Sequence, residues 1–335
     1  MIDNKSGQFN LRRIIFSYGF YIVLVAVFII YSLGATSFLT ISNLANILRD
    51  IAPLLVIASG LTLVIVTGSL DISVGSIALA SAAAGIFLTS RLQLSTPAMI
   101  LIALAVGTCL GAINGFLIVV LRINALVTTL GMMIALRGVG LDLLGGSQWM
   151  VPDALVDFTR LKVGPIYSGT IVALVIAGVA QVVLTRTVFG RHLAAIGNSP
   201  VIAARLGVRV RLTTFAVFVL SGFLASAGGI LTAAHLAVVH PYLGQGLEFL
   251  GVAAVVVGGT SLFGGEGSVI PGTLIGVITL ILIENGLNLM GASPFVYPFV
   301  RGLIIFTAMY ADSLRAQLHG QTRRIVTEAT AVGAE

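Results

Sequence analysis

Long uncharged segments are the feature that most constrains the fold of this 335-residue chain. One covers residues 14–33, and two more, residues 51–70 and 72–90, flank a single acidic residue. Each is about the length of one bilayer-spanning helix, ~20 residues. Charged residues make up 9% of the chain, against about 25% in a soluble domain. The sequence therefore predicts an all-α polytopic membrane protein and excludes an ordinary soluble enzyme.

The apolar segments indicate about ten transmembrane helices, some of them broken. The first is too long for the apolar core of a cleavable signal peptide, ~7–15 residues, so we expect it to be retained. A separate amphipathic surface piece is expected at 42–48 and a longer polar loop at 142–165. The expected spans are 14–33, 51–67, 74–89, 98–121, 125–141, 166–184, 212–235, 248–257, 269–290 and 295–311.

The distribution of Lys and Arg predicts the orientation, because cytoplasmic loops of membrane proteins are enriched in these residues. With the N-terminal segment 1–13 in the cytoplasm, twelve of them fall inside and four outside. This asymmetry predicts a membrane domain at 14–311, with the loop 185–211 and the tail 312–335 also cytoplasmic. The inside set is Lys5, Arg12, Arg13, Arg122, Arg186, Arg191, Arg205, Arg209, Arg211, Arg315, Arg323 and Arg324, and the outside set is Arg49, Arg91, Arg160 and Lys162.

Asp71 lies in a stretch of small residues, 66–76, between two expected spans. A carboxylate at mid-membrane depth costs at least ~2.5–3.5 kcal/mol, so it must face protein or water. Two interpretations stay open. The stretch is a broken or re-entrant element inside the membrane domain, or a cytoplasmic turn in which Asp71 is the N-cap of the next helix. The two overlap, because a turn can also line a pathway. The stretch 258–267 is similarly rich in glycine, through internal duplication or because two turns independently favour glycine.

The loop 185–211 carries the signals of a short helix. Ser199 is a good N-cap, Pro200 a good first helical residue and Gly207 a natural stop. So short a helix is marginal in water and should pack on the membrane domain or on a second protein, for example in a groove of a partner. The alternative is a plain connecting loop with arginines at the membrane surface.

Several kinds of chemistry are missing from the sequence. Neither lysine, Lys5 or Lys162, follows a glycine, and no phosphate-binding GxxxxGK[ST] motif occurs, so the chain cannot be its own P-loop ATPase. The single Cys109 allows no internal disulfide, and the four histidines form no HExxH motif. We expect no metal, no cofactor, no nucleic-acid partner and no enzymatic activity. Asp71 and Glu284 are the candidates for an ion relay, which makes a secondary carrier the weaker hypothesis.

Four motifs make the chain resemble the permease subunits of bacterial monosaccharide importers of the ATP-binding cassette class, the ribose/xylose/arabinose-type family. The resemblance covers roughly residues 10–312. The chain departs from the family pattern at Ser69, where glycine is usual, at Glu266 and Glu284, where other residues are usual, and at 197–199. The four motifs are residues 67–76, residues 111–115 with 124–131, residues 187–208, and residues 254–267 continuing through 272–276 to 285–288.

The resemblance implies a fold like that of the large, type II-like ten-helix importers, as in vitamin B12 uptake. It implies a second permease copy, as a homodimer or as a heterodimer with a related permease. It also implies a cytoplasmic ATP-binding subunit that docks on the loop 187–208 and a periplasmic sugar-binding protein. The chain itself would be a multi-pass protein of the bacterial inner membrane with both termini cytoplasmic.

We therefore expect a permease that moves a monosaccharide, a pentose, hexose or related polyol, into the cytoplasm and is gated by a separate ATPase. The alternative is an ion-coupled secondary carrier for a small polar solute. The candidate substrate contacts are Asp71, Ser73, Asn114, Thr128, Thr129, Thr260, Asn285 and Asn288; for each, the alternative role is an interhelical hydrogen bond, worth ~0.6 kcal/mol on average. The candidate ATPase contacts are Gly190, Arg191, Ile196, Gly197, Asn198, Pro200, Ala203, Ala204 and Arg205.

Overall fold

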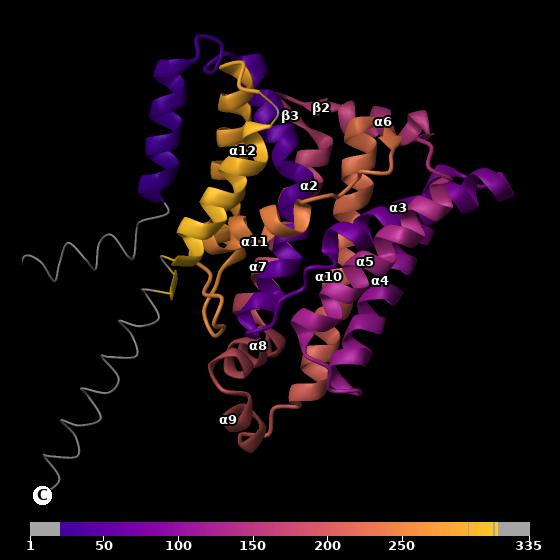
Figure 1. The fold of residues 1–335 in the computed structure, drawn as a ribbon, viewed down its shortest axis with the longest axis vertical. Coiled ribbons are helices and arrows are strands. Elements are labelled where there is room, and N and C mark those ends of the chain that lie inside the picture. Colours follow the sequence, from indigo (N-terminus) through magenta and orange to yellow (C-terminus); the bar gives the residue numbers. More distant parts are fainter. Residues whose placement is uncertain (1–20, 294, 311, 314–335) are drawn as a thin grey trace, which may run out of the picture.

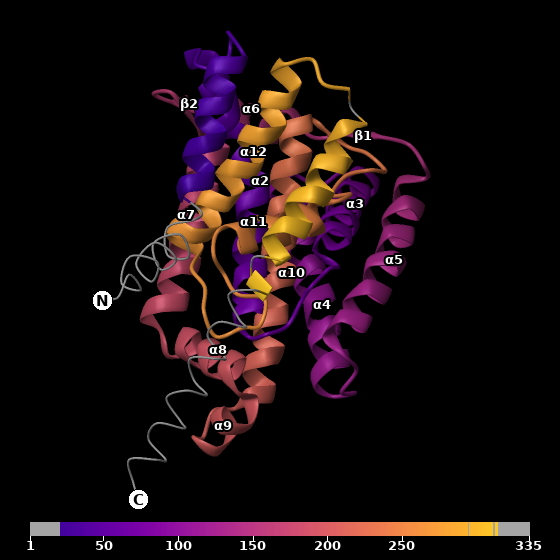
Figure 2. The same cartoon turned by 60° about the vertical axis from the view of Figure 1, so that its left-hand side comes forward.

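The protein is a bundle of helices of unequal length in a computed structural model that describes residues 21–293, 295–310 and 312–313 (Figures 1 and 2). Apolar helices Tyr21–Gly34 and Val296–Tyr310 stand at the two ends of the described chain. Between them lie α2 (Ile41–Val66), α3 (Val74–Leu92), α4 (Thr96–Val119), α5 (Ala125–Leu144), α6 (Asp153–Arg160), α7 (Ser168–Arg186), α8 (Val188–Asn198), α9 (Pro200–Arg205), α10 (Val210–Leu236), α11 (Leu247–Val257), the π-helical turn η1 (Val269–Thr273) and α12 (Leu274–Leu289).

Seven helices within the described residues are long and apolar enough to cross a membrane: α2, α3, α4, α5, α7, α10 and the continuous segment Val269–Leu289. Three further apolar helices, Tyr21–Gly34, Leu247–Val257 and Val296–Tyr310, are shorter than a full span. The all-α membrane class is confirmed, whereas the count of about ten spans is not. Residues 14–20 of the first expected span, the segment 1–13 and nearly all of the tail 312–335 lie outside the described residues.

Helix α2 differs from its prediction, because residues 42–48 are its first turns and not a separate surface piece. Thr40 caps it, accepting a hydrogen bond from the Asn43 backbone N–H at 3.3 Å. In the structure Arg49 Nη2 donates to the His235 carbonyl at 3.2 Å and Asp50 lies 3.4 Å from the His235 imidazole, whereas Arg49 Nε is buried without a hydrogen-bond partner among the described residues. The helix continues through both residues.

The segment 142–165 is not the plain loop that was predicted. It contains β1 (Trp149–Met150), α6 and β2 (Lys162–Val163). Strand β1 pairs antiparallel with β4 (Val238–Val239), and β2 pairs antiparallel with β3 (Ile166–Tyr167). These short pairings tie the connections together at one end of the bundle.

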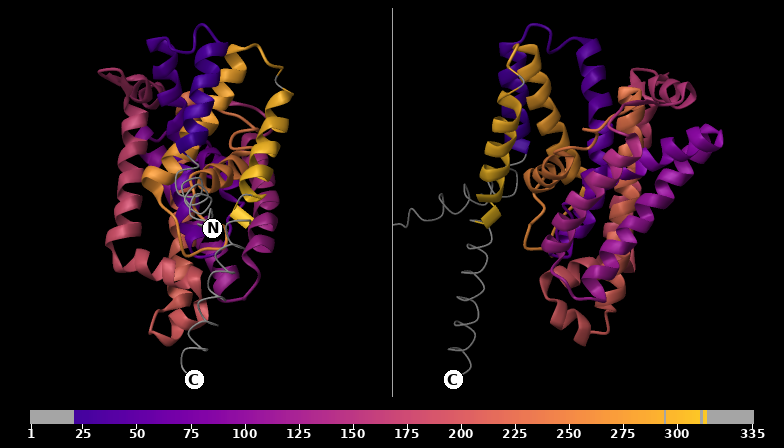
Figure 3. Two further views of the ribbon diagram at one scale, coloured as in Figure 1. Left: turned by 90° about the vertical axis from the view of Figure 1, so that its left-hand side faces the viewer. Right: turned by 45° about the vertical axis from the view of Figure 1, so that its right-hand side comes forward.

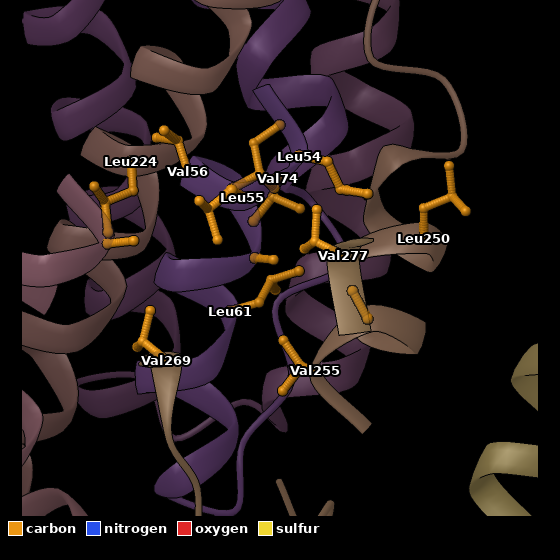
Figure 4. Close-up of a cluster of buried hydrophobic side chains, with 14 of the residues drawn as sticks. Leu54, Leu55, Val56, Leu61, Val74, Leu224, Leu250, Val255, Val269 and Val277 are labelled. Carbon is orange, nitrogen blue, oxygen red and sulfur yellow. The ribbon is translucent and has the colours of Figure 1, made fainter. Parts of the chain in front are cut away.

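Helix α2 is the centre of the apolar core. Leu55, Leu61 and Ile65 have no exposed surface, and α2 contacts α7, α8, α10, α11 and α12. A helix that is apolar around its whole circumference belongs in the interior. Figure 4 shows Leu54, Leu55, Val56 and Leu61 of α2 among Val74, Leu224, Leu250, Val255, Val269 and Val277 of the surrounding segments.

Glycines allow a close helix contact between α4 and α10. A Cβ atom added at Gly107 would lie 2.7 Å from the Gly222 carbonyl oxygen, and one added at Gly222 would lie 2.3 Å from the Gly107 carbonyl oxygen. Such close approach needs small residues and is typical of helix pairs in membranes. Helices α4 and α5 lie on one side of the molecule, and α12 with Val296–Tyr310 lies on the other (Figures 1 and 3).

The two ends of the bundle carry different elements. Helix α6 and the β2–β3 pair lie at one end, which we call the α6 end, and α8 and α9 lie at the opposite, α8 end (Figure 1). Helix α2 runs from the first to the second. Near its start the Thr170 hydroxyl of α7 donates to the Leu48 carbonyl at 2.8 Å, and at its last residue Val66 the carbonyl accepts from the Gly265 N–H at 2.9 Å.

Candidate functional site

The chain between α2 and α3, residues 67–73, is non-helical and buries Asp71 completely. One carboxylate oxygen accepts from the Ser73 N–H at 3.1 Å and the Ser73 hydroxyl at 2.5 Å, and the other accepts from the Ser221 hydroxyl of α10 at 2.7 Å. The Asn114 amide of α4 donates to the Ser73 hydroxyl at 2.8 Å. This network provides the partners that a buried carboxylate requires. It joins the break in the chain to α4 and α10.

The structure combines the two interpretations of Asp71. Ser73 is the N-cap of α3, and the Asp71 carboxylate accepts the Ser73 N–H at 3.1 Å, as a capping side chain does at the start of a helix. Ser221 lies near the middle of the 27-residue α10, which places Asp71 deep within the bundle. The stretch therefore starts at the surface with the exposed Gly68 and reaches a buried, non-helical Asp71. Irregular backbone is tolerated at membrane depth in such a buried environment.

Three threonines predicted to contact substrate are also buried. The Thr129 hydroxyl of α5 donates to the Leu70 carbonyl at 3.4 Å, which connects the start of α5 to the break. The hydroxyls of Thr128 and Thr260 have no hydrogen-bond partner within the part of the chain that the structure describes. Together with Asp71, Ser73 and Asn114, these residues form the packed polar interior and do not line the cavity described next. Their contact with substrate stays a prediction.

A cavity of about 450 Å³ lies towards the α6 end, between α2, α10, α11, α12 and Val296–Tyr310. Two predicted residues, Asn285 and Asn288, line it. Sequence reasoning assigned no substrate contact to its other polar residues, Asp50, Thr232, His235, Glu284, Tyr297 and Arg301. The apolar part of the wall consists of Pro53, Leu54, Leu236, Leu247, Leu250 and Ile281.

The ionisable side chains of this cavity are paired across helices. Arg301 Nε donates to Glu284 Oε1 at 2.7 Å, joining Val296–Tyr310 to α12. His235 Nε2 lies 3.4 Å from Asp50 Oδ1, joining α10 to α2. The four side chains remain between 25% and 42% exposed, so a solute can reach them. Asn285 is held by a reciprocal amide pair with Asn43, at 2.8 and 3.0 Å.

Glycines form a three-way contact at the α8 end, which we call the glycine junction: Gly68, Gly197, Gly264 and Gly265. A Cβ atom added at Gly197, near the end of α8, would lie 2.0 Å from the Val66 carbonyl oxygen and 2.3 Å from the Gly265 nitrogen. One added at Gly264 would lie 2.7 Å from the Gly68 nitrogen. The two glycine-rich stretches that look alike in sequence are therefore in contact, and α8 touches both. Their origin by duplication stays untested.

The short helix predicted in the loop 185–211 is confirmed as α9, with Ser199 as its N-cap accepting from the Ile202 N–H at 3.3 Å. Helix α8 precedes it. The predicted ATPase contacts divide by exposure: Arg191, Asn198, Pro200, Ala204 and Arg205 are exposed and Gly197 is half-buried, whereas Gly190, Ile196 and Ala203 are buried against the chain's own helices. The exposed apolar side chains of α9 and its C-cap, Val201, Ile202 and Leu206, were not among the predicted contacts.

Spanning helices around a buried polar break, together with a separate polar cavity towards the α6 end, define a multi-pass membrane protein suited to solute passage. Residues 43–309 match the family described as branched-chain amino acid transport system / permease component, and the chain belongs to this family. It is similar to three proteins of Escherichia coli (strain K12). The probable ABC transporter permease protein YphD is 35% identical over 91% of this chain and 92% of that protein.

The other two relatives carry more specific names. The ribose import permease protein RbsC is 35% identical over 87% of this chain and 92% of its own length. The galactose/methyl galactoside import permease protein MglC is 33% identical over 89% of this chain and 94% of its own length. No solved structure matches the chain. The comparisons thus confirm the resemblance to permeases of ATP-binding cassette importers.

Proposed function

We propose that this chain is the membrane permease of an importer that moves a monosaccharide or related polyol from the periplasm to the cytoplasm. The names of RbsC and MglC, which are import permeases for ribose and for galactose or methyl galactoside, support this substrate class. The observation that carries the proposal is the α8 end: an exposed short helix, α9, follows α8, which touches the buried Asp71 break through the glycine junction.

The proposed energy source is a separate ATPase that binds α9. Its exposed Val201, Ile202 and Leu206 form an apolar surface bordered by Arg205 and Arg209, and such a surface at the end of a membrane bundle fits a protein groove. A displacement of α9 passes along α8 to Gly197 and from there to the backbone of Val66. Because backbone touches backbone there, no side chain is available to absorb the movement.

The proposed orientation places the α8 end in the cytoplasm. Arg186, Arg191, Arg205, Arg209 and Arg211 all lie in or beside α8 and α9, and excess positive charge marks the cytoplasmic side. The α6 end would then face the periplasm and a sugar-binding protein. A second permease copy, and a fold like that of the type II-like ten-helix importers, rest on the sequence resemblance.

Uptake by proteoliposomes tests this function. The full chain is reconstituted with its ATPase and binding protein, and accumulation of radiolabelled D-ribose and D-galactose is measured with ATP on the ATPase side. We expect accumulation of one of these sugars that requires both ATP and the ATPase. Accumulation by the chain alone, driven by a sodium or proton gradient, would show an ion-coupled carrier instead.

A further inference from the structure

We propose that the cavity lined by Asp50, His235, Glu284, Asn288 and Arg301 holds the solute in transit and selects neutral, polyhydroxylated solutes over anions. This inference rests on the proposed function and adds a binding site and a selection rule to it. We call this the transit cavity.

The size and position of the transit cavity suit a small solute. Small-molecule sites usually have volumes of about 300–1,000 Å³, and the transit cavity, at about 450 Å³, falls in this range. It is bounded by segments far apart in the sequence, from Asp50 of α2 to Arg301 of the last described helix. A site at the junction of several helices is where a change in their packing alters its shape.

The side chains of the cavity wall match the hydrogen-bonding needs of a polyol. Carboxylates accept hydrogen bonds, guanidinium donates them, and amides do both, so the wall offers both partners that a hydroxyl group needs. Hydrogen bonds to charged groups are roughly twice as strong as those between neutral groups. Leu54, Leu250 and Ile281 supply apolar surface for the C–H groups that a polyol carries beside its hydroxyls.

The charges of the cavity wall favour a neutral solute over an anion. With His235 neutral, the described residues that line the cavity include two anions, Asp50 and Glu284, and one cation, Arg301. Arg49 lies nearby, but its guanidinium donates to the His235 carbonyl and stacks on the Tyr167 ring at 5.4 Å rather than lining the cavity. At the wall itself an entering anion therefore meets more negative than positive charge, and Arg49, whose charge acts on Asp50 from outside the wall, offsets part of this excess. A neutral polyol meets no such repulsion.

The affinity of the transit cavity for a solute is expected to be weak. Glu284 and Arg301 already bond to each other at 2.7 Å, and Asp50 lies 3.4 Å from His235. A solute must compete with these pairs for the same polar atoms, which weakens its binding. Weak binding is what a site along a conduit requires, because the solute has to leave it.

Cysteine modification in the full chain in lipid nanodiscs measures the charge of the cavity directly. Cys109 is replaced by serine, and Asn288→Cys places a thiol at the cavity wall. Leu161→Cys, at an exposed position of the α6 end outside the cavity, is the accessibility control; because Arg160 and Lys162 flank it, free cysteine in solution gives the reference ratio of the two reagents. The rates of a cationic and an anionic methanethiosulfonate reagent are compared at both thiols. One uncompensated charge at ~10 Å with an effective dielectric of ~20 changes the local concentration of a monovalent reagent roughly tenfold.

We expect the cation-to-anion rate ratio at N288C to exceed the ratio for free cysteine in solution by roughly tenfold or more. Glu284→Gln and Asp50→Asn should each lower this ratio, and Arg301→Gln should raise it, while the rates at L161C report that the variants are folded. A ratio at N288C equal to that of free cysteine, or the same direction of change in E284Q and R301Q, would overturn the selection rule.

Solute protection tests occupancy with the same proteins. D-ribose, D-galactose and myo-inositol serve as neutral probes, and D-ribose 5-phosphate serves as the anion. At least one neutral probe should slow modification of N288C but not of L161C, and the phosphate should not. Failure of every neutral probe up to its solubility limit, or equal protection by the phosphate, would overturn the site. Proteoliposome uptake is measured separately, so loss of the site and loss of the proposed function are distinguishable.

Discussion

Gly197→Ala is the substitution that most sharply tests how α8 acts on the membrane helices. The new methyl group would lie 2.0 Å from the Val66 carbonyl oxygen and 2.3 Å from the Gly265 nitrogen, so backbone must move. Overpacking of this kind typically costs about 1–3 kcal/mol. The displacement also stretches the 2.9 Å hydrogen bond from Gly265 to Val66, worth about 1 kcal/mol.

This destabilisation acts on the contact between α8 and the Asp71 break. The coupling of ATP hydrolysis to uptake should therefore weaken, while the transit cavity is unchanged. Since about 1.4 kcal/mol changes an equilibrium tenfold, we expect ATP-dependent uptake by G197A proteoliposomes to fall roughly tenfold or more. The ATPase should still bind and hydrolyse ATP, because the exposed residues of α9 are unchanged. Solute protection of N288C should be retained.

The matched control is Gly178→Ala in α7, where an added Cβ atom meets no atom of the described residues within 4 Å. Alanine there should be neutral or stabilising by up to about 1 kcal/mol, because it is the better helix former. If uptake by G197A equalled uptake by G178A, the glycine junction would not transmit the movement of α8.

Three further substitutions test separate parts of the structure. Ser221→Ala removes the donor to one Asp71 oxygen and should destabilise the folded protein by about 1.5–3 kcal/mol, seen as a lower thermal midpoint in detergent; an unchanged midpoint would show that this bond is not needed. Gly75→Ala places a methyl group 2.1 Å from Glu248 Oε2 and should reduce the folded fraction in size-exclusion chromatography, whereas a wild-type profile would contradict the packing of α3 on α11. Ala204→Glu, on the exposed face of α9, should abolish co-purification of the ATPase without lowering the thermal midpoint; retained co-purification would exclude α9 as the docking site.

Local signals in the sequence predicted the elements whose ends are punctuated locally. Helix α9 follows from Ser199 and Pro200, and α3 begins at Val74 as expected. The membrane class follows from the long uncharged runs. The continuity of α2 through Arg49 could not be predicted, because the carbonyl to which Arg49 donates lies 186 positions away at His235.

The residues that line the transit cavity could be predicted from local sequence even less completely. Asn285 and Asn288 were found by side-chain type, because amides within an apolar span attract attention. Asp50 and His235 looked like residues at helix ends, and nothing local indicates that they meet. The glycine-rich stretches were recognised as similar, but their contact at Gly197 is a property of tertiary packing.

An ATPase can bind α9 only if this helix faces the cytoplasm. Its side of the membrane is measured by thiol labelling with an impermeant maleimide in right-side-out and inside-out membrane vesicles, using Cys109→Ser chains with Ala204→Cys or Leu161→Cys. We expect A204C to be labelled in inside-out vesicles and protected there by the bound ATPase, while L161C is labelled in right-side-out vesicles. Labelling of A204C in right-side-out vesicles would show that α9 faces the periplasm, where no cytoplasmic ATPase can reach it.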